Sequence, residues 1–170
     1  MSDIVDVLIG VDCESIIAGY GENNAPTAPP MMEYENLYMV IRNGNNLNYN
    51  KSPYLYLKAS AENESVATSI RWRARSVSMG FGYEAFLTNF ILYDGKDVIT
   101  QPVHRVLETK SFIPDKSNPG QLISQSVVDH FWESTVLRAG YIAYFFYLAI
   151  VDHTGRVRGY YRNDPAVVAQ

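Results

Sequence analysis

The sequence lacks the features that mark several broad classes of protein. Cys13 is its one cysteine, so no internal disulfide can form, as is usual in a reducing cytoplasm. The net charge is −4 and no long basic run occurs, which argues against nucleic-acid binding. The longest uncharged apolar stretch, residues 140–151, is too short for a membrane-spanning helix, and the N-terminus does not resemble a signal peptide. We therefore expect a cytoplasmic protein with neither a nucleic-acid nor a membrane partner.

Catalytic and metal-binding motifs are also missing. The histidines His104, His130 and His153 are far apart and show no His-x-x-x-His spacing, so a zinc site would have to be assembled by the fold. The neighbours of His130 favour a hydrogen-bonded structural role, and His153 falls in a predicted turn. No Gly-x-Ser-x-Gly motif marks a nucleophile. We predict no catalytic residue, no metal ligand and no cofactor.

The other residues capable of chemistry carry little specificity. Cys13 lies beside Asp12 and Glu14, whose negative charges disfavour a reactive thiolate. These two carboxylates could share a strand face, as in a glycosidase or calcium site, but that spacing is common by chance. The segment Gly80-Phe81-Gly82 lacks the third glycine and the lysine of a phosphate-binding loop.

What the sequence does contain is typical of a β-rich protein. It is 47% apolar and 13% aromatic, with 13 tyrosines, and tyrosine is frequent in half-buried sheets. Its 170 residues are expected to form one domain, residues 1–170. An alternative explanation of the tyrosines is an adhesive surface for carbohydrate or for other copies of the chain.

Apolar alternation and β-prone runs bounded by turn residues predict the strands. These segments are 4–18, 36–42, 54–59, 68–77, 84–93, 97–100, 103–109, 134–138, 141–151 and 156–162. Turns are expected at Asn43-Gly44 and Asp94-Gly95, and residues 122–132 fit either a short helix or an irregular crossing segment. The fold class is all-β: an antiparallel β-sandwich, jelly-roll-like or Greek key, of about eight or nine strands with at most one short helix. A barrel is the alternative.

Two groups of side chains suggest binding surfaces. Arg71, Arg73 and Arg75 alternate along a strand and share one face, which is either a solvated sheet face or a patch for an acidic ligand. Aromatic and amide side chains in or near loops could stack on a sugar. The residues concerned are Tyr20, Tyr34, Tyr49, Trp72, Trp132 and the segment Asn43–Asn50.

The C-terminal segment predicts a hairpin around a central strand. An uncharged aromatic run, Tyr141 to Tyr147, leads to the turn from Asp152 to Gly155 and then to a second strand ending in Asp164-Pro165. This segment resembles the PixA/AidA family of bacterial inclusion-body proteins. Further matching positions are Ile4-Val5-Asp6-Val7-Leu8-Ile9, Asp12, Ile16-Ile17, Asn23-Asn24-Ala25-Pro26-Thr27 and Gly159-Tyr160-Tyr161. The chain departs from the family where Asn163, rather than a tryptophan, precedes Asp164.

The resemblance implies a β-sandwich that forms cytoplasmic inclusions and is linked to host interaction or quorum-controlled behaviour, without established catalytic residues. Our leading hypothesis is a non-enzymatic protein that self-associates. The alternatives are a lectin-like module for a carbohydrate or small metabolite, and an enzyme, which would need convergent ionisable groups in a pocket.

Overall fold

Strands make up most of the structure. The computed structural model describes residues 4–42, 54–57 and 68–169, and in this part of the chain it has ten strands, one α-helix and one 3-10 helix. In chain order the elements are β1 (Ile4–Val11), α1 (Cys13–Tyr20), η1 (Tyr34–Asn36), β2 (Leu37–Arg42), β3 (Tyr54–Leu57), β4 (Ser69–Ser76), β5 (Tyr83–Asp94), β6 (Val103–Pro114), β7 (Leu122–Thr135), β8 (Gly140–Asp152), β9 (Val157–Asn163) and β10 (Ala166–Ala169).

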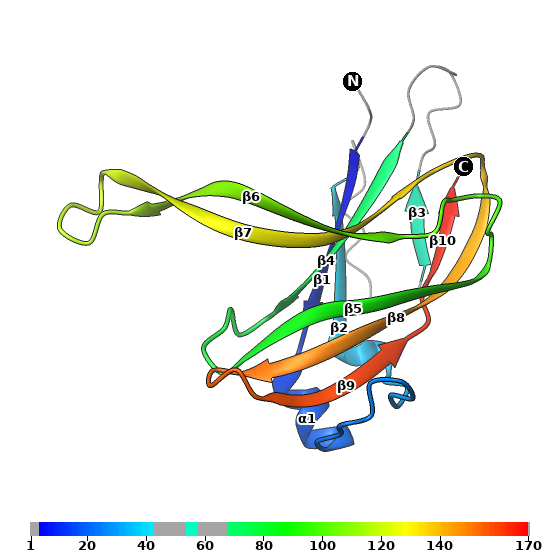
Figure 1. Cartoon of the computed structure of the whole chain (residues 1–170), viewed down its shortest axis with the longest axis horizontal. Helices are drawn as coiled ribbons and strands as arrows, with labels where there is room; N and C mark the ends of the chain where they lie inside the picture. The colour runs from blue at the N-terminus through cyan, green and yellow to red at the C-terminus, as the bar shows by residue number, and fades with distance from the viewer. Residues whose placement is uncertain (1–3, 43–53, 58–67, 170) are drawn as a thin grey trace.

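The strands form two sheets that pack face to face, which confirms the predicted β-sandwich (Figure 1). The first sheet has the order β2-β1-β4-β7-β6. The second has the order β3-β10-β8-β5, and β9 also pairs with β8. Most neighbours are antiparallel, as expected, but β1 pairs with β4 and β3 with β10 in parallel.

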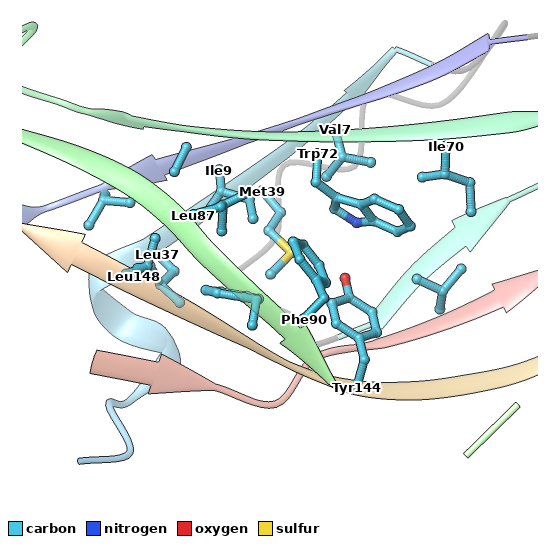
Figure 2. Packing of buried hydrophobic residues seen from close by; sticks show 14 of the residues in the cluster. Val7, Ile9, Leu37, Met39, Ile70, Trp72, Leu87, Phe90, Tyr144 and Leu148 are labelled. Carbon is cyan, nitrogen blue, oxygen red and sulfur yellow. The ribbon is translucent and has the colours of Figure 1, made fainter. Parts of the chain in front are cut away.

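The core between the sheets follows the period of two that the sequence predicts for strands. Alternate residues of β1 are buried, and alternate residues of β2, β4, β5 and β8 likewise bring apolar side chains from both sheets into one cluster (Figure 2). Its largest members are Trp72, Tyr144, Tyr161, Phe146 and Phe90. In β8 several residues of the other face are buried as well. In β5 the alternation is interrupted: the register with β8 shifts between Leu87 and Asn89, so that Phe90 points into the core.

Trp72 of β4 lies at the centre of this core. Its ring is 5.3 Å from that of Phe90 and 5.9 Å from that of Tyr144 on the opposite sheet. The Trp72 indole nitrogen faces the Tyr144 hydroxyl in Figure 2, but neither atom has a hydrogen-bond partner of normal geometry among the described residues. Burial raises the pKa of the Tyr144 hydroxyl, and the facing indole N–H offsets this only in part.

Strand β8 is a central strand, as the aromatic run from Tyr141 to Tyr147 predicted. It pairs with β5 along one side, and with β9 and then β10 along the other. The break between β9 and β10 falls at Asp164-Pro165, because proline has no N–H to give to the ladder. The strand that follows, Ala166–Ala169, was not predicted.

Four predicted elements are corrected by the structure. The first strand ends at Val11, and α1 begins where the strand was expected to continue, because the Asp12 side chain caps the helix by accepting the Ser15 N–H at 3.1 Å. Residues 97–100 form a turn and a single bridge rather than a strand. Residues 122–132 belong to the long strand β7, which ends at Thr135, so residues 134–138 do not form a separate strand.

Two further predictions can be compared with the described residues. No helix in the described ranges is long and apolar enough to cross a membrane. The turn at Asn43-Gly44 and the candidate sugar-binding residues Asn43–Asn50, including Tyr49, lie outside the described residues.

The β8–β9 turn leads to a prediction about pH. Hydrogen bonds from the Thr154 hydroxyl (2.5 Å), from the backbone N–H groups of Arg156 and Thr154, and from Arg158 hold the pKa of the Asp152 carboxyl well below its usual range. A depressed native pKa stabilises the fold above the unfolded value of about 3.9, and this contribution disappears as the pH falls towards the lower native value.

We therefore expect Asp152→Asn to unfold at a lower urea concentration than the wild type at pH 7, and the difference to shrink as the pH falls below about 4. Urea unfolding at pH 7, 5 and 3 measures it. The exposed Glu33→Gln variant is the control and should match the wild type closely. A difference between Asp152→Asn and the wild type that stays constant with pH would show that the charge of Asp152 does not contribute.

Candidate assembly surface

Strands β6 and β7 leave the two sheets and project as a long two-stranded arm (Figure 1). Only the end of β7, from Trp132 to Thr135, pairs with β4. Before Trp132, β7 pairs with β6 alone. The register between β6 and β7 is unbroken, from Val103 opposite Glu133 to Pro114 opposite Leu122. We use the term arm for residues 106–114 and 122–128 with their connecting turn.

The base of this hairpin is held by contacts on both faces. The inner face is the one turned towards β5 of the second sheet. On this face the Trp132 indole N–H donates to the Leu87 carbonyl of β5 at 3.1 Å, and the His130 ring lies 5.4 Å from that of Phe86. On the outer face, the Phe131 ring lies under two guanidinium groups, those of Arg71 (5.0 Å) and Arg73 (5.3 Å). These contacts fix the direction in which the arm leaves the sandwich.

Beyond the base, apolar side chains remain exposed on both faces of the arm. Because side chains alternate along a strand and paired residues share a face, the inner face continues from Trp132 and His130 to Val128 and Leu122 in β7. The most exposed apolar residues of the arm are Val128 (73%), Val106 (63%), Phe112 (63%) and Leu122 (62%), and all four lie on the inner face. Leu107, Ile113 and Ile123 are exposed on the outer face.

The tip of the arm is ordered by its own hydrogen bonds. The Asp115 carboxylate accepts the N–H groups of Ser117 (2.6 Å) and Asn118 (3.2 Å), and the Asp115 N–H donates to the Gln121 carbonyl at 2.8 Å. Such Asx turns fix a hairpin connection locally. A hairpin with two solvated faces is nevertheless marginally stable in water, so the arm has the form of an element that gains stability when something packs against it.

The fold brings two of the three histidines together, across β6 and β7. The rings of His104 and His130 are 5.8 Å apart, and His153 lies exposed in the β8–β9 turn. Burial lowers the pKa of His130, with further lowering from Arg75 and His104. The sequence predicts a hydrogen-bonded role for His130. Its Nε2 is buried without a hydrogen-bond partner in the described structure, and its ring packs against that of Phe86 instead.

The other chemical candidates have structural positions. Asp12 caps α1 and Glu14 is exposed in its first turn, so the two carboxylates do not share a strand face. Cys13 is buried, and burial raises its pKa to about 11, which leaves the thiol protonated at neutral pH. Gly80-Phe81-Gly82 lies in the β4–β5 connection. Among the described residues, no group of three or more metal-ligating side chains is suitable for a metal ion.

Strand β7 supplies two carboxylates to the three arginines of β4. Arg71 pairs with Glu133 at 2.9 Å, and Arg73 and Arg75 both pair with Asp129. Since each guanidinium group already has a carboxylate partner, the face is a half-exposed ion-pair network at the base of the arm rather than a patch of unpaired cations.

The described aromatic residues proposed for sugar binding are buried or hydrogen-bonded within the fold. Trp72 is fully buried and Trp132 is half-buried with its N–H bonded to β5. The Tyr34 hydroxyl donates to the Asp164 carboxylate at 2.6 Å, and the Tyr20 hydroxyl accepts the Glu33 N–H at 2.7 Å.

The arm was not predicted from the sequence, although its residues carry a recognisable signal. Four pairs of adjacent apolar residues occur within it: Val106-Leu107, Phe112-Ile113, Leu122-Ile123 and Val127-Val128. On a strand, each pair places one side chain on each face. Such pairs separated by polar residues indicate a ribbon that is apolar on both faces.

Comparison with known proteins supports the fold. The family model described as "PixA: Inclusion body protein" matches residues 3–168. A crystal structure of an inclusion body protein (PixA) from Burkholderia cenocepacia J2315 is 16% identical, with a TM-score of 0.78, and the alignment covers 99% of this chain and 97% of that one. No curated protein matched.

Proposed function

Because the chain belongs to the PixA family of inclusion body proteins, we propose that it is a non-enzymatic protein whose copies self-associate into cytoplasmic inclusions. The observation that carries the proposal is the arm, with exposed apolar side chains on both of its faces. Through the family resemblance, the proposal includes a role in host interaction or in quorum-controlled behaviour.

Two physical arguments support self-association through the arm. An element with large apolar side chains exposed on both of its faces is typical of a contact surface, and a β-ribbon of this kind gains stability when it is covered. The net charge of −4 on 170 residues leaves little repulsion between copies, so dense packing is feasible.

The positions of the ionisable groups support a non-enzymatic role. Asp129 and Glu133 are paired with arginines, Asp12 caps a helix, and Cys13 is buried as a thiol. These groups serve the fold, two of them on β7 and two at the start of α1, whereas acid–base or nucleophilic catalysis requires convergent groups with access to a substrate.

A dilution series tests the proposal. We expect sedimentation velocity to show a dimer or larger species at micromolar concentration, which dissociates to the monomer of 19.2 kDa on dilution. The dissociation should be reversible, because apolar contacts and strand pairing re-form when the concentration is raised. A monomer at every concentration up to the solubility limit would contradict the proposal.

A further inference from the structure

No described strand pairs with the outer edge of β6, which is open in this part of the structure. All twelve residues from Val103 to Pro114 pair with β7 on one side, without a register shift, and β6 is the last strand of its sheet in the described structure. An open edge presents a row of unpaired N–H and C=O groups to a second strand, and long edges without a bulge are those that pair most readily. Proline occurs only at the end of this edge, at Pro114.

The side chains along this edge are self-complementary about Thr109. When two copies of a strand pair antiparallel around a two-fold axis, residues equidistant from the axis lie opposite each other on the same face. With Thr109 on the axis, Glu108 of each copy lies opposite Lys110 of the other. In the same register Val106 lies opposite Phe112, so that two ion pairs are flanked by two apolar pairs on the inner face.

We propose that two copies of this chain join through their β6 edges, antiparallel, with Thr109 on the two-fold axis. The inference rests on self-association, the proposed function, and adds the partner strand and its register. The β2-β1-β4-β7-β6 sheet of one copy then continues into the same sheet of the other copy, and the two arms lie side by side along β6.

The charges select this register over its neighbours. An axis at Glu108 sets the two Glu108 carboxylates opposite each other, and an axis at Lys110 does the same for two ammonium groups. Like charges directly opposite destabilise a strand pair, whereas opposite charges stabilise it. The open edge of β7 offers no such selection, because residues 122–128 contain no charged side chain.

Charge reversal with mixing tests the pairing. Glu108→Lys and Lys110→Glu each turn two attractive pairs into two repulsive ones, so each variant alone should dimerise about tenfold more weakly than the wild type. An equimolar mixture restores opposite charges in every pair and should regain wild-type association as a heterodimer. Sedimentation velocity measures all three samples. Glu108→Gln serves as a control for the hydrogen bond that Ser126 donates to Glu108 at 2.6 Å.

Cysteine cross-linking tests the register directly. Opposite residues of antiparallel strands have Cα atoms about 4.5–5.5 Å apart, within the range of a disulfide. Thr109→Cys should therefore form a covalent dimer under mild oxidation, with the buried Cys13 unreactive. The matched control is Leu107→Cys, which is also exposed, but whose two copies would be offset by about 13 Å along the strands.

The outcomes separate the pairing from the proposed function. If the wild type self-associates but both single charge variants associate equally well, or if Leu107→Cys cross-links as readily as Thr109→Cys, the pairing is wrong and self-association stands. If the wild type is monomeric throughout the dilution series, both are wrong. Binding of the arm to vesicles or to another protein by a wild type that remains monomeric would also overturn the pairing.

Discussion

Trp72→Ala is expected to lower the free energy of unfolding by about 3–5 kcal/mol, the usual cost of removing a fully buried large aromatic side chain. Trp72 is 0% exposed and contacts Phe90 and Tyr144, which belong to the opposite sheet. Its removal leaves a cavity between the sheets that neither can fill without moving. Since whole domains are stable by about 5–15 kcal/mol, this single change removes a large part of the total.

A second variant separates volume from hydrogen bonding. Trp72→Phe keeps most of the packing and removes an indole N–H that has no partner in the described structure, so it should cost much less than Trp72→Ala. Phe81→Ala is the surface control, because Phe81 is 93% exposed, and it should change stability by less than about 0.5 kcal/mol. Urea unfolding followed by circular dichroism, at two protein concentrations, measures all three. Equal losses for Trp72→Ala and Phe81→Ala would contradict the central position of Trp72.

The sandwich could be predicted because its sheets are buried on one face. In β1 and β4, burial on one face forces the apolar residues into a period of two, and this period is visible in the sequence at Val5, Val7 and Ile9, and again at Ile70 and Trp72. In β8 both the aromatic content and the flanking turn indicated a central strand. The two parallel pairings could not be predicted, because alternation identifies a strand but not its neighbours.

Helix α1 shows where local signals compete. Val11 is followed by Asp12, a good helix N-cap, but Ile16 and Ile17 also fit an extended strand. The helix has eight residues, too few to show a helical period in the sequence. Capping by Asp12 and the burial of Ile16 against the core decide in favour of the helix.

The arm was missed for a related reason. A strand exposed on both faces is under no constraint to alternate, so β7 from Leu122 to Val128 shows paired apolar residues instead of a period of two. The absence of alternation suggested a helix or an irregular segment there. The paired residues mark each strand of the arm, but which pairs of β6 and β7 share a face follows only from their register.

The second large effect is expected from Phe112→Ser on the arm. Phe112 is 63% exposed and lies on the inner face, where in the proposed dimer it packs against Val106 of the other copy, a contact that occurs twice by symmetry. Each cross-strand apolar pair contributes about 0.2–1 kcal/mol, so the loss of both should raise the dissociation constant about two- to thirtyfold. The variant should keep the stability of the monomer, since the side chain has little cover in the single copy. Sedimentation equilibrium measures the constant.

Phe81→Ser is the matched control for this prediction. It makes the same chemical change at a phenylalanine that is 93% exposed, in the β4–β5 connection. If association depends on the arm, Phe112→Ser weakens it and Phe81→Ser does not. An equal effect of both variants would mean that copies associate through exposed apolar surface of any kind, because Phe81 offers more of it. No effect of either would exclude the Phe112 side chain from the contact, and self-association would then have to be explained by another part of the surface.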